Sequence, residues 1–245
     1  MSESDFYTIL PDDYSKFDQK YKLVVIGDPG VGKSCLTKYG TTKKFDTTYT
    51  PTIGFEYYTF KIRIKETDIQ LQIWDTCGQE NYRSLISSFY HNSSLAILVF
   101  SINNKDTFNN LELWMNDIKV NSNPDVKIFL VGNKSDLEDE REVLTTDAEE
   151  FSMKHGISKY METSAKTGFN SEKLFAEAAN ILYQEYIKFK EKKHEENNNN
   201  DNKSDTISLK QYENPTYTPI TRGKKRKWCF PGLLWYNRFR QHTGI

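Results

Sequence analysis

The chain has 245 residues, a hydrophobic fraction of 37% and a mean hydropathy of −0.72, which excludes a packed domain over its whole length and favours one domain with polar tails. Its formal net charge of −1 disfavours a nucleic-acid-binding chain. Seven of the 33 basic side chains lie in residues 222–245, which hold no acid, so the first 221 residues carry 26 bases against 34 acids. We therefore expect an acidic body and a basic terminus.

The cysteines and apolar runs indicate the compartment. Three cysteines are too few and too scattered for a disulfide framework or a zinc site, and they are typical of a reducing compartment. The longest apolar run, residues 95–100, is far shorter than the ~20 residues that span a bilayer. The first twenty residues lack the features of a secretory signal, and Ser2 stands where N-myristoylation needs glycine. We expect a cytoplasmic protein.

Short apolar runs alternate with longer amphipathic segments along most of the chain. Runs rich in Val, Ile and Leu predict strands that are covered on both faces at residues 21–26, 69–74, 95–100 and 126–131. Residues 55–64 alternate instead, as an edge strand does. Apolar residues at three- and four-residue spacing predict helices over residues 106–120 and 171–189. This order predicts an α/β fold, with a mostly parallel six-stranded sheet and helices on both faces.

The predicted domain covers residues 18–190 and follows an N-terminal extension, residues 1–17. Residues 191–221 contain a run of Asn and few apolar side chains, which cannot offset the entropy lost on ordering the backbone. We expect them to form a disordered Asn-rich linker. Residues 222–245 form a basic aromatic tail.

Residues 27–34, GDPGVGKS, fit the phosphate-loop pattern G-x-x-x-x-G-K-[ST], directly after a predicted strand and before a helix-compatible run at residues 35–39. Glycines let backbone N–H groups approach phosphate oxygens, and the helix N-terminus adds its positive dipole end. The lysine can reach the β- and γ-phosphates, and the serine hydroxyl can bind Mg²⁺. The motif predicts a P-loop NTPase that contacts its nucleotide through Asp28, Pro29, Gly30, Val31, Gly32, Lys33, Ser34 and Cys35.

A second motif, residues 133–136, selects the base. The Asp136 carboxylate can accept two N–H bonds from guanine, whereas adenine would leave it unpaired. Lys134 can lie along the base, and Asn133 can hold the loop together. Such a tetrapeptide is by itself also typical of a turn. Its place between the phosphate loop and ETSAK at residues 162–166 favours guanine, with further contacts expected from Ser164, Ala165 and Lys166.

The segment WDTCGQE, residues 74–80, ends a predicted strand. Asp75 is placed there to hold Mg²⁺, through water. Gly78 can donate its N–H to a γ-phosphate oxygen, and Gln79 can orient the attacking water. Together with Lys33, these two residues are the predicted catalytic groups.

Residues between the phosphate loop and this segment complete the predicted site. Thr52 is the candidate second hydroxyl on Mg²⁺. Phe45 can lean on the base, and Tyr49 can cover the phosphates.

These five motifs, in this order from about residue 21 to 187, resemble the Ras-superfamily small GTPases. Residues 54–56 (GFE) and 74–90 look more like the Rab branch than the Ras branch, and residues 137–151 leave no room for the insert of Rho proteins. The resemblance implies a switch that binds GTP with Mg²⁺ and slowly hydrolyses it to GDP, in vesicle traffic or signalling. It also implies an exchange factor, an activating protein and effectors as partners.

Several residues depart from what rapid GTP turnover requires. Residues 41–50 hold no arginine, so an activating partner is expected to supply one. Cys77 stands where the family usually has Ala, and Pro29 has no N–H to donate. These departures keep open a GTP-dependent binding module with little turnover. A Ras-like signalling switch and an ATP-using P-loop enzyme also stay open, and Cys77 has a redox-sensitive thiol as its second interpretation.

The tail departs from the family pattern, whose members usually end in prenylated cysteines. The chain ends QHTGI, so no prenylation motif is present. Basic residues 224–227 and the aromatic residues that follow predict contact with an anionic membrane at its cytosolic face, with Cys229 as a candidate palmitoylation site. The tail could instead be a nuclear-localisation or nucleic-acid patch, or have no function.

Overall fold

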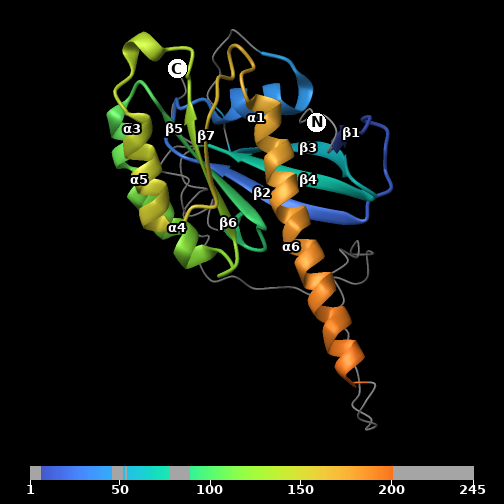
Figure 1. The fold of residues 1–245 in the computed structure, drawn as a ribbon. Coiled ribbons are helices and arrows are strands. Elements are labelled where there is room, and N and C mark those ends of the chain that lie inside the picture. The colour runs from blue at the N-terminus through green and yellow to red at the C-terminus, as the bar shows by residue number, and fades with distance from the viewer. Residues whose placement is uncertain (1–6, 46–51, 53, 78–88, 201–245) are drawn as a thin grey trace, which may run out of the picture. The chain divides into compact units, whose positions relative to one another are not determined.

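The computed structural model describes residues 7–45, 52, 54–77 and 89–200, and within them it forms a seven-stranded sheet in the order β1-β3-β4-β2-β5-β6-β7 (Figure 1). The pairs that join β2, β4, β5, β6 and β7 are parallel, whereas β3 is antiparallel to both β1 and β4. The predicted α/β fold is confirmed, but the predicted number of six strands is wrong. The strands are β1 Tyr7–Ile9, β2 Gln19–Ile26, β3 Phe55–Ile64, β4 Thr67–Thr76, β5 Leu95–Ser101, β6 Lys127–Asn133 and β7 Lys159–Glu162.

The extra strand comes from the segment that we predicted as an N-terminal extension. Tyr7 pairs with Ile64 at the end of β3, and the Leu10 N–H donates to the Lys61 carbonyl at 2.9 Å. Further along, Asp68 holds the Arg63 guanidinium at 2.5 and 2.8 Å and accepts a hydrogen bond from the Tyr14 hydroxyl. Because β1 pairs with residues 62–64 only, the prediction of an edge strand over residues 55–64 is wrong at that end of β3.

Helices cover both faces of the sheet, as the sequence predicts (Figure 1). Leu36 of α1 and Phe175 of α6 pack on one face, and Trp114 and Ile118 of α4 pack on the other with Ala148 of α5. No helix in the described ranges combines the length and apolarity needed to cross a membrane. The helices are α1 Lys33–Thr42, α3 Lys105–Asn109, α4 Leu111–Asn121, α5 Thr145–His155 and α6 Ser171–Asn200, with a 3-10 turn at Glu138–Glu140.

Two helices differ from their predicted bounds. The helix predicted over residues 106–120 is divided at Asn110, which ends α3 and begins α4. The last helix continues to Asn200, so the prediction of a disordered linker from residue 191 is wrong for its first ten positions. Glu and Lys are good helix formers, and the Lys190 ammonium lies 4.5 Å from the Tyr186 ring centroid one turn earlier. Residues 201–245, with Cys229, lie outside the described residues.

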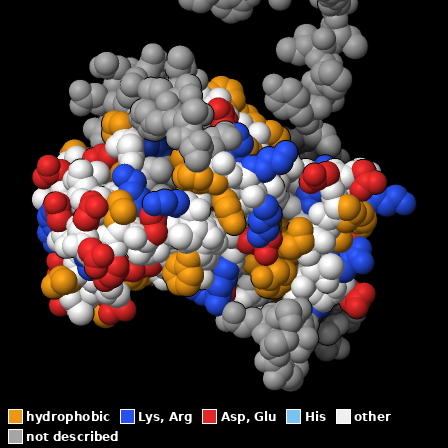
Figure 2. All heavy atoms as spheres, turned by 90° about the horizontal axis from the view of Figure 1, so that it is seen from above, with side chains coloured by type: hydrophobic (Ala, Val, Ile, Leu, Met, Phe, Trp, Pro, Cys, Tyr) orange, Lys and Arg blue, Asp and Glu red, His pale blue; other side chains and the backbone are white. Residues whose placement is uncertain are grey.

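Two surface features lie away from the predicted motifs. Figure 2 shows acidic side chains gathered on the side of the molecule that carries α3 and α5, in keeping with the acidic body expected from the charge count.

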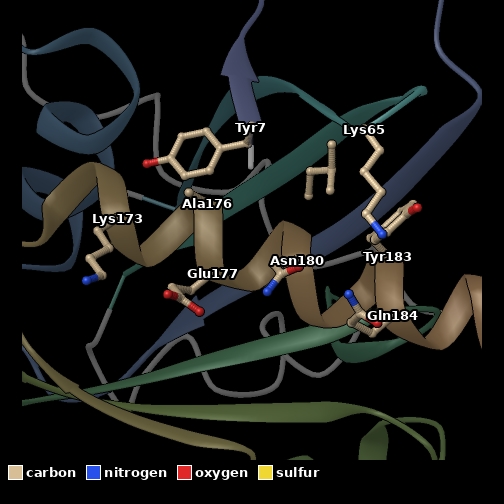
Figure 3. Close-up of a pocket in the computed structure, with 9 residues that line it drawn as sticks. Tyr7, Lys65, Lys173, Ala176, Glu177, Asn180, Tyr183 and Gln184 are labelled. Carbon is tan, nitrogen blue, oxygen red and sulfur yellow. The ribbon is translucent and has the colours of Figure 1, made fainter. Parts of the chain in front are cut away.

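A cavity of about 330 Å³ opens between β1, the β3–β4 turn and α6 (Figure 3). Its apolar wall includes Tyr7 and Ala176, and Lys65 reaches over it from the turn. The cavity contains none of the residues predicted to bind nucleotide.

Candidate nucleotide-binding site

The phosphate loop joins β2 to α1, which is the strand–loop–helix context that its motif requires. Gly27 has a φ of 137°, and a Cβ there would lie 2.1 Å from the carbonyl oxygen of Val99 on β5. Gly32 has a φ of 92°, and a Cβ there would lie 2.5 Å from the Asn133 side-chain nitrogen. The two glycines therefore permit close packing of the loop on β5 and on the base motif.

Lys33, the first residue of α1, is buried with an exposed fraction of 6%. Its ammonium donates to the carbonyl oxygens of Gly27 at 2.9 Å and Asp28 at 2.8 Å. Burial lowers the pKa of Lys33 to about 8, although the nearby carboxylates of Asp75 and Asp28 act in the opposite direction. A cation that is held by neutral carbonyls keeps its charge available to an anion at the loop.

Three oxygen-bearing side chains converge beside the phosphate loop. The Ser34 hydroxyl lies 2.7 Å from that of Thr52 and donates to the Asp75 carboxylate. The other Asp75 oxygen, Oδ1, is buried and has no hydrogen-bond partner within the described residues. Burial raises the pKa of Asp75 to about 7, against the Ser34 hydrogen bond and the Lys33 charge, which lower it. Hydroxyl and carboxylate oxygens suit Mg²⁺, and the unpartnered oxygen is a polar group that a cation or its water would satisfy.

At the base end, Asn133 joins three segments. Its side-chain N–H donates to the carbonyl oxygen of Val31 in the phosphate loop at 2.8 Å, and its side-chain oxygen accepts from the Thr163 hydroxyl at 3.1 Å. Asn133 is only 1% exposed. The predicted loop-holding role therefore agrees with the position of this side chain.

The Asp136 carboxylate is already oriented within the chain. The Ser164 hydroxyl donates to it at 2.5 Å, and the Lys166 ammonium lies 3.8 Å from its other oxygen. The Ser164 N–H donates to the Phe169 carbonyl at 3.0 Å, which leaves the Ala165 N–H as the better candidate for the guanine carbonyl. Lys134, between the two anchored residues, has a φ of 65°. The base motif and residues 162–166 thus form one hydrogen-bonded unit.

For the remaining residues of the predicted site, the structure gives fewer contacts. Phe45 follows α1 and is 38% exposed. Pro29 is exposed, whereas Cys77 is 2% exposed and packs in the core that contains Trp114, which agrees with a small apolar role for the thiol. The predictions for Tyr49, Gly78 and Gln79 fall outside the described residues.

Sequence reasoning missed two residues that contact the phosphate loop. The Asn110 side-chain amide donates to Asp28 Oδ2, and the Trp114 indole donates to Asp28 Oδ1, both at 2.7 Å. One signal was available, because an acidic side chain in a loop that receives phosphates needs hydrogen-bond donors to hold it.

A buried lysine and hydroxyls at a glycine-rich strand–helix turn, with a carboxylate at the end of a neighbouring strand, define a P-loop nucleoside triphosphate-binding domain. Comparison with protein-family models matches residues 22–184 to the Ras family. The match covers more than half of the chain, and the chain belongs to this family. The protein is therefore a small GTPase switch, and Ras-family proteins generally use Mg²⁺ with GTP.

Proposed function

We propose that this protein is a Rab-like GTPase whose GTP-bound form recruits effectors in vesicle traffic, and that its nucleotide and Mg²⁺ bind at the site described above. The cluster of Ser34, Thr52 and Asp75 carries the metal part of this proposal, because Asp75 Oδ1 is buried there without a partner within the described residues. The sequence pattern at residues 54–56 and 74–90 supports the Rab-like branch.

In this proposal the chain's own residues bind and orient the nucleotide. Lys33 contacts the terminal phosphates, Asp136 accepts the guanine N–H groups, and Gln79 orients the attacking water. Bound Mg²⁺ supplies neutralisation of phosphate charge. The chain places no arginine between residues 41 and 50, so hydrolysis stays slow until an activating partner supplies one.

An aromatic surface supports effector binding. The rings of Phe55, Trp74 and Phe89 lie 4.7–5.3 Å apart between centroids, and Tyr57 packs 5.2 Å from Trp74. Phe55 and Tyr57 are each 47% exposed. Phe55 follows Thr52 by three positions and Trp74 precedes Asp75, so this surface adjoins both proposed metal-site segments. Exposed aromatic side chains are favoured anchors for partner proteins, and here their partner affinity would follow the bound nucleotide.

Single-turnover hydrolysis of bound GTP tests the enzymatic part. We expect slow hydrolysis by the natural chain, a further loss in Gln79→Leu, and competition for the site by GTP and GDP but not by ATP. Equal, negligible hydrolysis by both proteins would favour the binding module with little turnover, and equal competition by ATP would contradict the guanine assignment.

The effector and trafficking parts need separate tests. We expect proteins captured by the GTP-loaded chain to be lost when Trp74 is changed to Ala, and a tagged copy to visit a vesicular compartment.

We also propose that residues 222–245 contact anionic membranes and that Cys229 can be palmitoylated. Equal sedimentation of the chain with anionic vesicles in the presence and absence of residues 222–245 would contradict the membrane contact.

A further inference from the structure

The Asp28 side chain connects the phosphate loop to the junction of α3 and α4. Each carboxylate oxygen accepts one hydrogen bond of 2.7 Å, Oδ1 from the Trp114 indole and Oδ2 from the Asn110 amide. Both donors are neutral, and Trp114 is 2% exposed with its ring packed in the core on that face of the sheet. A rigid core residue therefore determines where one side chain of the phosphate loop points.

Asn110 would ordinarily be expected to cap a helix. It stands at the N-cap of α4, yet its side chain makes no capping hydrogen bond there. Asn104, at the N-cap of α3, does cap its helix by accepting from the N–H groups of Asp106 and Thr107. Asn104 has the extended backbone that a side-chain cap requires, whereas Asn110 has helical backbone, and its side chain is directed to the phosphate loop instead.

The orientation of the Asp28 side chain matters because the backbone and the side chain of this residue bind different partners. Its carbonyl oxygen accepts a hydrogen bond from the Lys33 ammonium at 2.8 Å, while its carboxylate accepts hydrogen bonds from Asn110 and Trp114. A carboxylate released from these donors would be drawn to Lys33 and would also repel incoming phosphate groups. The two neutral donors hold this carboxylate in hydrogen bonds, although its charge still acts on Lys33.

We propose that Asn110 and Trp114 are positioning residues that act through Asp28 to hold the phosphate loop in the form that retains nucleotide. This inference rests on the proposed nucleotide site. Removing either donor leaves one carboxylate oxygen unsatisfied and frees Asp28 to compete for Lys33, so bound GDP dissociates faster.

The test is a double-mutant cycle on the dissociation of fluorescent mant-GDP from the full chain. We expect about tenfold faster dissociation from Trp114→Phe, which keeps a ring in the core, and a severalfold increase from the milder Asn110→Ala. In an Asp28→Ala background, where no carboxylate remains to be misplaced, Trp114→Phe should cause no further increase. Asn121→Ala, which loses a hydrogen bond of 2.8 Å to Asp117 on the same helix, is the matched control and should release mant-GDP at the natural rate.

Thermal unfolding of each variant separates positioning from simple loss of stability. A purely structural role for Trp114 would speed release equally in both backgrounds, and that result would overturn the inference. Natural dissociation rates for both Trp114→Phe and Asn110→Ala would overturn it as well. If the natural chain itself failed to bind mant-GDP, the proposed nucleotide site would fail and the inference with it. Normal binding with unchanged variants would contradict the inference alone.

Discussion

The two ends of the nucleotide site differ in how fully their polar groups are paired. At the base end, Asn133 bonds to Val31 and Thr163, and Asp136 accepts from Ser164. At the phosphate end, the Lys33 ammonium donates to carbonyls of its own loop, and one buried Asp75 oxygen has no partner within the described residues. In the proposed site, the base end is organised before a ligand arrives, whereas nucleotide and cation would complete the contacts of the phosphate end.

The largest effect is expected at the incomplete end. Changing Lys33 to Ala removes a buried cation beside the phosphates, and we expect GTP affinity to fall by at least about a hundredfold. Fluorescence titration with mant-GTP measures the change. Lys119→Ala, at an exposed position on α4, is the control and should bind GTP normally. A loss below threefold for Lys33→Ala would remove the distinction between the two ends.

Proton binding by Asp75 provides a second test. Its pKa is raised by burial to about 7 from an ordinary value of 3.8, so between these values the folded chain holds a proton that the unfolded chain has released. Without Mg²⁺, the free energy of unfolding should therefore fall by roughly 2–3 kcal/mol as the pH rises from 5 to 7. Added Mg²⁺ should stabilise the protein more at pH 8 than at pH 5.

Urea unfolding in EDTA over this pH range, with Asp75→Asn as the reference variant, isolates the contribution of this carboxyl. The variant cannot titrate there, so the difference between the two proteins should depend on pH. If the free energies of unfolding of the two proteins varied with pH in parallel, Asp75 would keep an ordinary pKa. The hydrogen-bonding groups of the phosphate end would then be paired no less fully than those of the base end.

Asn133 connects the two ends, and its removal should affect both. Asn133→Ala leaves the Val31 carbonyl and the Thr163 hydroxyl without their partner, which should lower the free energy of unfolding by about 2 kcal/mol. Urea unfolding and GDP dissociation measure the two consequences. Asn180→Ala, exposed on α6, should change neither quantity. Faster dissociation with unchanged stability would mean that the base end is not organised through Asn133.

The smallest effect is expected at Ser164. Ser164→Ala removes the 2.5 Å hydrogen bond to Asp136 but leaves the carboxylate in place, so GTP affinity should fall only about three- to tenfold. The dependence of binding on Mg²⁺ should stay the same, as competitive titration at two Mg²⁺ concentrations would show. Ser158→Ala is the exposed control. A changed Mg²⁺ dependence would contradict the separation of the two ends.

The motifs predicted the centre of the fold because each combines a local pattern with a strand end. The phosphate loop follows β2, the base motif follows β6, and Asp75 lies on β4, so parallel pairing brings them to one edge of the sheet. The sequence could also indicate which ligands bind at this edge of the sheet, because few residue types are suited to bind phosphate, guanine or Mg²⁺.

The missed features depend on distant partners. Asn110 and Trp114 lie 82 and 86 positions from Asp28, and no local periodicity reports such contacts. Tyr7–Ile9 is too short to show a strand pattern, and only pairing with β3 gives it that conformation. Helix α6 extends beyond its predicted last residue because the helix propensity of its side chains and contacts one turn apart stabilise a polar helix. Hydropathy alone does not predict such a helix.

The N-terminal strand also determines where a usable fragment of this protein can begin. The family match starts at residue 22, and a fragment cut close to that point would lack β1. The backbone of residues 62–64 would then lose its partner strand and expose unpaired N–H and carbonyl groups beside Ile62 and Ile64. Such a fragment would retain the phosphate loop and yet be prone to self-association, so loss of material during purification should not be mistaken for loss of nucleotide binding.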